Sequence, residues 1–322
     1  MKQVRLVVAY DGTRYCGWQL QSNGNTIEAE LNKAISGLTG EEIHVLGASR
    51  TDSGVHARGN IAVFHTESRI PAEKFCYALN QRLPEDIVVQ ASDEVAEDYH
   101  PRKCNSLKTY EYRIMTGRFP DPTKRLYAHF CRWELDVEAM AQAAAVLAGE
   151  HDFSSFCSAG SQAEDTIRKI ITAQVEADGQ EIVIRLVGNG FLYNMVRIIS
   201  GTLLEVGKGF LTPDDMKRIL NARDRRQAGG TAPANGLTLV SIRHLDRLPE
   251  LERNTNDWVD YTLDRSELYD RGIEKMIIHR CAPGERERME ERTAKHVFRD
   301  GGKELWIGEE QAPDSWKIVK NH

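Results

Sequence analysis

The chain has 322 residues, of which 41% are hydrophobic and 28% are charged, and this ordinary globular composition excludes collagen-like and largely disordered proteins. The formal net charge of −6 argues mildly against a nucleic-acid partner, because domains that bind nucleic acids are often strongly basic. No apolar run approaches the ~20 residues that span a bilayer, and residues 1–6 give no secretory signal. We therefore expect a cytoplasmic protein with no membrane partner.

The first part of the chain alternates between strand and helix patterns. Strands are expected at 2–10, 43–48, 61–66 and 87–91. One helix is expected to begin after Thr26, whose side chain can cap it, and to end at Gly40. A second helix is expected at 71–83, with Pro71 in its first turn. The order β-α-β-β-α-β is that of a split βαβ, or ferredoxin-like, unit.

The next part of the chain resembles the first. Helices are expected at 137–147, at 191–206 and from Thr212 onward. Strands are expected at 110–115, 167–177, 181–187 and 237–242, the middle two forming a hairpin around Asp178 and Gly179. We predict an α+β protein of two ferredoxin-like halves, residues 1–104 and 105–246, with sheets covered by helices on one side.

Residues 247–322 differ from the rest in composition. Of these 76 residues, 31 are charged, yet the segment holds three of the five tryptophans. Charge this dense is typical of a solvated helix or an appendage, whereas tryptophan is favoured at the centres of interfaces. We predict a charged extension that either packs on the core or docks a protein partner.

A polar loop lies between two of the predicted strands of the first half. It reads Gly47-Ala-Ser-Arg-Thr-Asp52-Ser-Gly-Val-His-Ala57, with Arg50 two residues before Asp52. Asp, Ser and Gly are ordinary turn residues, so a plain turn is one interpretation. Functional side chains also often lie on loops held by a rigid sheet, and Asp52 is therefore a candidate catalytic carboxylate.

Arg197 lies within an apolar helical segment, between Val196 and Ile198. A buried guanidinium without an anion costs several kcal/mol, so Arg197 needs a partner. It either reaches the surface, makes a structural ion pair, or pairs with a catalytic carboxylate that stays ionised as a result.

The segment Lys108-Thr-Tyr110-Glu-Tyr112-Arg113-Ile reads as a strand. Tyr110 and Tyr112 would share one of its faces. An aromatic ring on a sheet can stack on an unstacked base, although core packing is the commoner fate of a strand tyrosine. We expect Tyr112, more than Tyr110, to belong to the core.

Several motifs are absent from the sequence. It has no Gly-x-Gly-x-x-Gly, Walker loop, His-Glu-x-x-His, Gly-x-Ser-x-Gly or Cys-x-x-Cys. Their absence disfavours nucleotide-driven, nicotinamide, zinc-hydrolase, serine-hydrolase and thioredoxin-like chemistry. We expect neither a metal nor a cofactor.

The run Arg50-Thr-Asp52-Ser-Gly-Val-His-Ala57 resembles the signature of the TruA-type tRNA pseudouridine synthases, which carries their catalytic aspartate. Other features similar to that family follow in order, namely 10–19, 99–102, 108–112, 191–197 and 232–237. The resemblance covers residues 3–245. Ser49 departs from it, because the family usually has Gly there.

The resemblance implies two ferredoxin-like halves whose sheets join around an active-site cleft. It implies an isomerase that converts uridine to pseudouridine at positions 38–40 of the tRNA anticodon stem-loop, without a cofactor. Members of the family act as homodimers, with one tRNA spanning both subunits. The main alternative is a non-catalytic RNA-binding module that keeps the fold.

Residue roles follow from the same resemblance. Asp52 would attack the ribose or abstract a sugar proton, and Arg197 would be its ion-pair partner. Tyr110 would stack on the flipped uracil and serve in the final proton transfer, while Arg50 would enter the stem to help extrude the base. Local positive charge can bind RNA despite an acidic total charge. Candidate phosphate contacts are Arg14, Arg58, Lys103, Lys108, Arg113, Lys124, Arg125 and Arg168.

Overall fold

The computed structural model describes residues 1–22, 24–161 and 163–244, together with five short strands beyond them. The chain divides into two units, Met1–Arg247 and Leu248–His322. In the second unit the described strands are β11 (Ile273–Lys275), β12 (His279–Arg280), β13 (Ala294–Asp300), β14 (Lys303–Gly308) and β15 (Val319–Lys320). β11 pairs with β15, and β14 pairs with both β12 and β13. The predicted packing or docking role of the charged extension lies outside the described residues.

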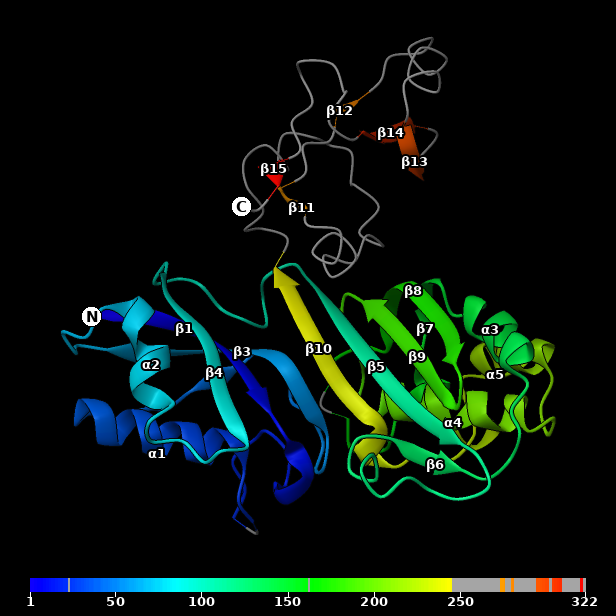
Figure 1. Cartoon of the computed structure of the whole chain (residues 1–322), viewed down its shortest axis with the longest axis horizontal. Helices are drawn as coiled ribbons and strands as arrows, with labels where there is room; N and C mark the ends of the chain where they lie inside the picture. The colour runs from blue at the N-terminus through cyan, green and yellow to red at the C-terminus, as the bar shows by residue number, and fades with distance from the viewer. Residues whose placement is uncertain are drawn as a thin grey trace. The chain divides into compact units, whose positions relative to one another are not determined.

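A single ten-stranded sheet forms the centre of the first unit (Figure 1). Its longest path runs β4-β1-β3-β10-β5-β9-β8-β7, with β2 added to β3 and β6 to β5. All pairs are antiparallel except β3–β10 and β5–β6. The strands are β1 (Lys2–Tyr10), β2 (Leu46–Gly47), β3 (His56–Thr66), β4 (Ile87–Val95), β5 (Ser106–Thr116), β6 (His129–Cys131), β7 (Gly149–Asp152), β8 (Ile167–Asp178), β9 (Glu181–Gly188) and β10 (Leu237–His244).

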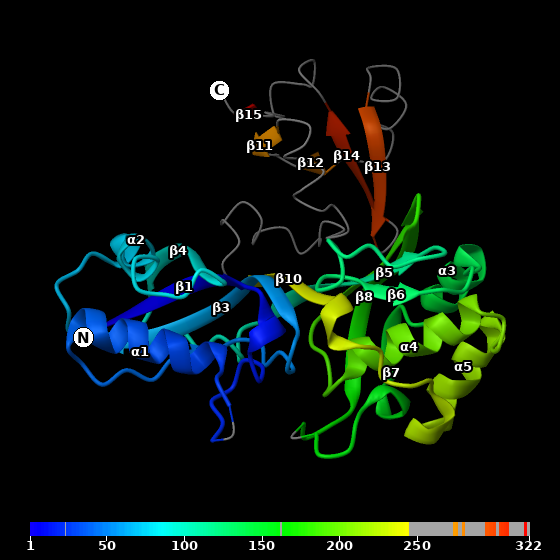
Figure 2. The ribbon, with the colours of Figure 1, turned by 60° about the horizontal axis from the view of Figure 1, so that its bottom comes forward.

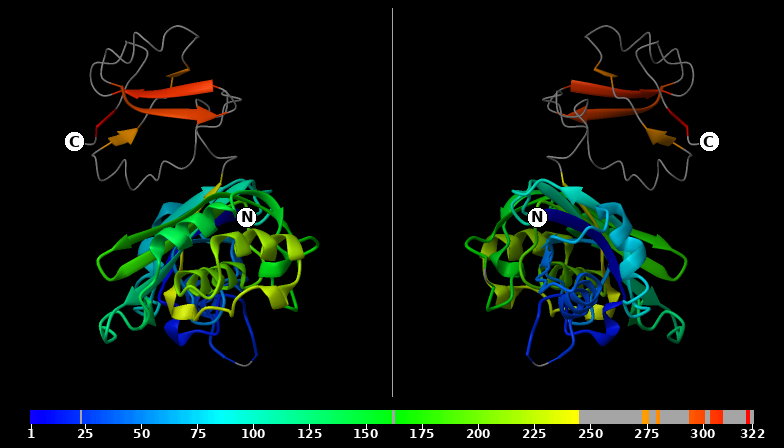
Figure 3. Two further views of the ribbon diagram at one scale, coloured as in Figure 1. Left: turned by 90° about the vertical axis from the view of Figure 1, so that its right-hand side faces the viewer. Right: turned by 90° about the vertical axis from the view of Figure 1, so that its left-hand side faces the viewer.

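Five α-helices accompany this sheet, and the predicted α+β class is therefore correct. They are α1 (Ile27–Thr39), α2 (Phe75–Leu79), α3 (Val137–Ala145), α4 (Met195–Gly207) and α5 (Pro213–Ala222). Figures 2 and 3 show α1 and α4 on the same face of the sheet. α3 packs against α4, α5 and β8. The apolar faces of the helices and the sheet enclose one main core.

Local sequence signals explain both ends of α1 and the start of α5. The Thr26 side chain accepts a hydrogen bond from the Ala29 amide at the start of α1, and Gly40 ends the helix in the left-handed conformation. Thr212 and Asp215 form a reciprocal capping box at the start of α5.

The predicted helix at 71–83 is wrong in extent. The segment forms a 3₁₀ turn at Ala72–Lys74 followed by α2, which ends at Leu79. The Asn80 side chain then bonds to both the amide and the carbonyl of Val89 on β4. This contact holds Asn80, the residue that follows α2, against β4, while its backbone amide still donates to the Cys76 carbonyl of the helix.

Two strands also differ from expectation. Only Leu46–Gly47 of the predicted strand 43–48 is paired as β2, and β3 begins at His56 rather than at residue 61. The early part of β3 lacks an apolar pattern, but Asn60 is buried there and its side chain bonds the Ser49 carbonyl and the Tyr10 hydroxyl. Tertiary hydrogen bonds thus override the local pattern.

The parallel pair β3–β10 joins strands β4-β1-β3 to strands β10-β5-β9-β8-β7, so that they form one continuous sheet. Thr238 and Leu239 of β10 pair with His56 and Ala57, the last two residues of the polar loop that holds Asp52. On its other side β10 pairs with β5, where Leu239 lies opposite Tyr110. This register brings the Asp52 loop beside the Tyr110 segment.

A glycine on α4 allows close packing against a neighbouring loop. A Cβ atom at Gly201 would lie 1.9 Å from the Gly230 carbonyl oxygen, whereas a Cβ at Gly37 of α1 would meet nothing within 4 Å. We predict that Gly201→Ala lowers the free energy of unfolding by about 1–3 kcal/mol because the backbone must shift.

The matched change Gly37→Ala should raise the free energy of unfolding by about 0.5–1 kcal/mol, since alanine loses less entropy in a helix. Urea unfolding of the two variants measures both effects. Equal effects in the two variants would contradict close packing at Gly201.

Candidate active site

The Asp52 loop is held in place by the segment that follows β1. The Trp18 amide donates to the Thr51 carbonyl at 3.1 Å, and the Gly54 amide donates to the Tyr15 carbonyl at 3.3 Å. Gly17 has φ +87°, and a Cβ there would lie 2.6 Å from the Thr51 oxygen. Only glycine combines this backbone conformation with so close an approach. The carboxylate is therefore presented by a constrained loop.

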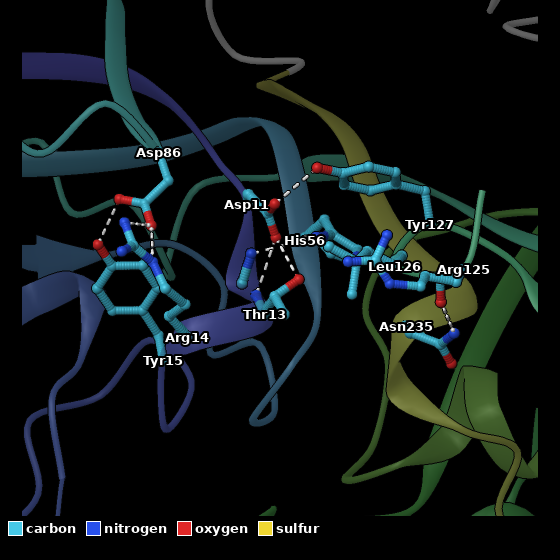
Figure 4. A network of polar contacts seen from close by, with 11 residues as sticks. Asp11, Thr13, Arg14, Tyr15, His56, Asp86, Arg125, Leu126, Tyr127 and Asn235 are labelled. Carbon is cyan, nitrogen blue, oxygen red and sulfur yellow. Dashed lines mark hydrogen bonds and ion pairs between the residues drawn. The ribbon is translucent and has the colours of Figure 1, made fainter. Parts of the chain in front are cut away.

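A polar network anchors the segment that holds this loop (Figure 4). The Asp86 carboxylate accepts hydrogen bonds from the Tyr15 hydroxyl at 2.6 Å and from the Arg14 guanidinium. The Asp11 carboxylate accepts a hydrogen bond from the Tyr127 hydroxyl at 2.8 Å. Arg14, a predicted RNA contact, is thus engaged with Asp86 although its side chain is largely exposed.

His56 extends the same network across the sheet. Its Nε2 lies 2.9 Å from the Leu126 carbonyl oxygen, to which it donates, and its Nδ1 accepts from the Gly12 amide at 3.2 Å. Nδ1 also lies 3.1 Å from the Asp11 carboxylate. The histidine that follows the Asp52 loop therefore links three segments (Figure 4).

Asp52 forms an ion pair with Arg197 of α4. The Arg197 Nη1 lies 3.1 Å from Asp52 Oδ2, and the two side chains are only 17% and 20% exposed. The same guanidinium donates to the Ala232 carbonyl at 2.8 Å and to the Asn194 side-chain oxygen at 2.9 Å. Of the three alternatives for Arg197, the structure shows pairing with the candidate carboxylate.

α4 begins later than expected, and this places Arg197 in its first turn. The predicted helix starts at 191, but Asn194 has φ 60°, so the regular helix begins at Met195. Asn194 tolerates this conformation better than most residues. Its side chain bonds both Ser158 and Arg197, which fixes the guanidinium toward Asp52.

Burial and the ion pair act on Asp52 in opposite directions. Burial raises the pKa of the carboxyl group, and the hydrogen bond and charge of Arg197 lower it by less. The pKa of Asp52 therefore lies above its ordinary value of 3.8. A partly desolvated carboxylate with one ionic partner is a stronger nucleophile or base than a fully hydrated one.

Tyr110 lies beside this pair at the surface of the cavity. Its hydroxyl lies 2.8 Å from the Ser49 hydroxyl, and the edge of its ring packs at 79° against Phe191. Burial raises the pKa of Tyr110 to about 12, while the hydrogen bond from Ser49 lowers it by less. Tyr112 is completely buried and donates to the Pro233 carbonyl, so it belongs to the core as predicted. Tyr110 is only 6% exposed and packs in the same core, although it also lines the cavity.

One cavity of about 720 Å³ brings these groups together. Asp52, Tyr110 and Arg197 line it, and so do Arg50 and Lys108. Ligand pockets are usually about 300–1,000 Å³, and this one is large enough for a nucleoside. Sequence reasoning assigned no role to three further groups on its wall, Ser49, Arg102 and Phe191.

The other predicted phosphate contacts have varied surroundings. Arg113 points to the opposite face of β5 from Tyr110 and forms ion pairs with Glu111 and Glu181. Arg58 and Lys103 are exposed and do not line the cavity. The remaining three make polar contacts: Lys124 with Glu181, Arg125 with the Pro122 carbonyl, and Arg168 with Asp165. RNA contact by these residues stays a prediction.

The part of the chain that the structure describes lacks both a metal-binding cluster and a membrane-spanning helix. It holds no group of three or more His, Cys, Asp or Glu side chains arranged to bind a metal ion. None of its helices combines the length and apolar character needed to cross a membrane.

Comparison with known proteins agrees with this geometry. A family model described as tRNA pseudouridine synthase matches residues 6–102 and 143–244. A protein of Brevibacillus brevis named tRNA pseudouridine synthase A is 48% identical over 242 residues, covering 75% of this chain and 99% of that protein. The protein of the same name from Acetivibrio thermocellus is 46% identical with the same coverage. The Moorella thermoacetica protein is 46% identical over 246 residues, 76% of this chain and all of that protein. This chain therefore belongs to the tRNA pseudouridine synthase family.

Proposed function

We propose that this protein isomerises uridine to pseudouridine at positions 38–40 of the tRNA anticodon stem-loop. The observation that carries the proposal is the Asp52–Arg197 ion pair at the wall of a nucleoside-sized cavity that also holds Tyr110. Because the proposed substrate is a tRNA, we place the action of this protein in the cytoplasm. The reaction breaks the N-glycosidic bond, turns the base over, and joins its C5 to the ribose C1′.

Asp52 is the group that acts on the ribose in this proposal. As a nucleophile it would bond C1′ while the N1–C1′ bond breaks, and the uracil would leave as an anion. As a base it would instead remove a sugar proton. Either route requires the carboxylate form, which the Arg197 guanidinium favours. C5 then attacks C1′: in the first route the Asp52–C1′ ester bond breaks and frees the carboxylate, and in the second route Asp52 returns its proton to the sugar. The C5 proton finally moves to N1 by way of a base, and no atoms are lost.

Tyr110 is proposed to stack on the flipped uracil. Base flipping costs a few kcal/mol, and one aromatic stack returns about 1–3 kcal/mol. The pKa of Tyr110, about 12, keeps its hydroxyl protonated at neutral pH. This favours stacking and hydrogen-bond donation, and proton uptake from C5 would need Ser49 or water as a relay. Arg50, exposed on the cavity wall, is proposed to enter the stem.

The fold is proposed to consist of two ferredoxin-like halves. The strand order β4-β1-β3 with β2 beside β3 supports this for the first half, and β10-β5-β9-β8 repeats it in the second. The parallel pair β3–β10 would then join the two halves.

We predict that Asp52→Asn preserves the fold and lowers turnover at least about 100-fold, because Asn can neither attack C1′ nor accept the sugar proton. The measurement is pseudouridine mapping of an unmodified tRNA transcript incubated without any cofactor. Asp214→Asn, an exposed change on α5, is the control and should keep wild-type turnover.

Turnover by Asp52→Asn close to that of the wild type would refute the catalytic assignment. Tight binding of the transcript by wild-type protein without any pseudouridine would instead favour a non-catalytic RNA-binding module.

The acid limb of the pH–rate profile tests the role of Arg197. Activity requires ionised Asp52, whose pKa is raised above 3.8, so kcat/KM should fall as the pH drops through that raised value. Loss of the guanidinium in Arg197→Met removes a nearby positive charge, and the limb should move upward by about one to three pH units. The exposed change Arg218→Met should leave the limb in place. An unmoved limb in a folded Arg197→Met protein would count against the pairing.

The proposed assembly is a homodimer in which one tRNA contacts both subunits. This rests on the similarity to the family. Light scattering during size-exclusion chromatography should give twice the chain mass of 36.4 kDa. A mass of one chain at micromolar concentration, in an active preparation, would contradict it.

A further inference from the structure

Lys108 lies next to the proposed base-stacking residue. It precedes Tyr110 by two residues on β5, so both side chains share one face of the strand, about 7 Å apart along it. β5 runs between β10 and β9 (Figure 1). Lys108 of β5 pairs with Gly188 of β9. Lys108 lines the same cavity as Asp52.

The Lys108 ammonium has no carboxylate partner among the described residues. It donates a hydrogen bond to the Ala48 carbonyl at 3.0 Å, which links β5 to the Asp52 loop. The charged groups that act on it are Arg102 and Arg168, both cationic. Burial and these two charges lower the pKa of Lys108 to about 8. Such a cation is stabilised when an anion enters the cavity.

Arg102 adds a second cation at the rim of the cavity. It is exposed, and its Nε donates to the Gly47 carbonyl at 2.8 Å, which fixes its position near the same loop. Arg168 is already neutralised by Asp165. The Glu28 carboxylate also acts on Arg102. Lys108 and Arg102 thus supply positive charge to the wall of the cavity that Tyr110 also lines.

We propose that Lys108, assisted by Arg102, binds the phosphodiester group adjoining the flipped uridine and so sets the position of the ribose before Asp52. This inference rests on the proposed function. A lysine ammonium is a compact point charge suited to a phosphate oxygen. A phosphate is also the one anion that every nucleotide in the stem supplies, so the site would be independent of base sequence.

The first test measures RNA affinity. Lys108→Met should raise the Kd for an anticodon stem-loop about tenfold, and should reduce the slope of log K against log salt by about one. Lys108→Arg should retain most of the affinity. The matched control is Lys217→Met, an exposed change on α5, which should match the wild type.

The same titration repeated between pH 7 and 9 separates the wild type from Lys108→Arg. Wild-type affinity should fall as the pH rises above about 8, because the uncharged amine no longer binds phosphate. The Lys108→Arg protein keeps its charge and should show a flatter profile.

A second test uses RNA in which the phosphodiester on the 5′ or the 3′ side of the target uridine is replaced by a neutral methylphosphonate. One of the two replacements should weaken wild-type binding about tenfold and should leave Lys108→Met binding unchanged, because the interaction is already lost. Additive losses for both replacements, or an unchanged Kd and salt slope for Lys108→Met, would overturn the proposal.

A fall in kcat for Lys108→Met with an unchanged Kd would also overturn it, because that pattern would place the ammonium on the base. These outcomes are distinct from failure of the proposed function, in which the wild-type protein would itself form no pseudouridine.

Discussion

The Asp52–Arg197 ion pair is the interaction on which the geometry of the site depends. Its partners are 145 residues apart in the sequence and come from a loop after β2 and from the first turn of α4. They meet because β10 pairs with both β3 and β5 and so joins the strands of the two parts of the chain into one sheet. The Gly17 contact, the Asp86 network and the Asn194 turn all fix one or other partner. Gly17 on one side and Asn194 on the other thus help to hold one carboxylate against one guanidinium.

The wall of the cavity carries more positive than negative side chains, and this excess of positive charge suits an anionic substrate. Asp52 is the acidic group on the cavity wall, and Arg197 already compensates it. Lys108 and Arg102 remain in the same cavity with backbone carbonyls as their recorded hydrogen-bond partners. A desolvated cation such as Lys108 is costly to the folded protein when no anion neutralises it, and a polyanionic substrate would relieve that cost on binding. In the proposed function, this local positive charge lets a protein with a net charge of −6 bind RNA.

Local pattern was enough to predict the α+β class, the capped helices α1 and α5, and the hairpin β8–β9. It failed where tertiary contacts accompany the structure, as at Asn80, which follows α2 and bonds to β4, and at Asn60, which supports the start of β3. The apolar sequence around Arg197 indicated only that its guanidinium needs an anion, and the resemblance to the family implied that this anion is Asp52. The hydrogen bond between Ser49 and Tyr110 could not, since nothing in the sequence relates a loop serine to a strand tyrosine 61 residues away.

A double-mutant cycle on Asp52 and Arg197 tests the central claim most directly. The free energies of unfolding in urea would be measured for wild type, Asp52→Asn, Arg197→Met and the double variant. The cycle cancels the bonds of Arg197 to Ala232 and Asn194, and isolates the pair. A stabilising coupling of at least about 1 kcal/mol is expected for this largely buried contact. Losses that add within about 0.5 kcal/mol would show that the two side chains are not coupled.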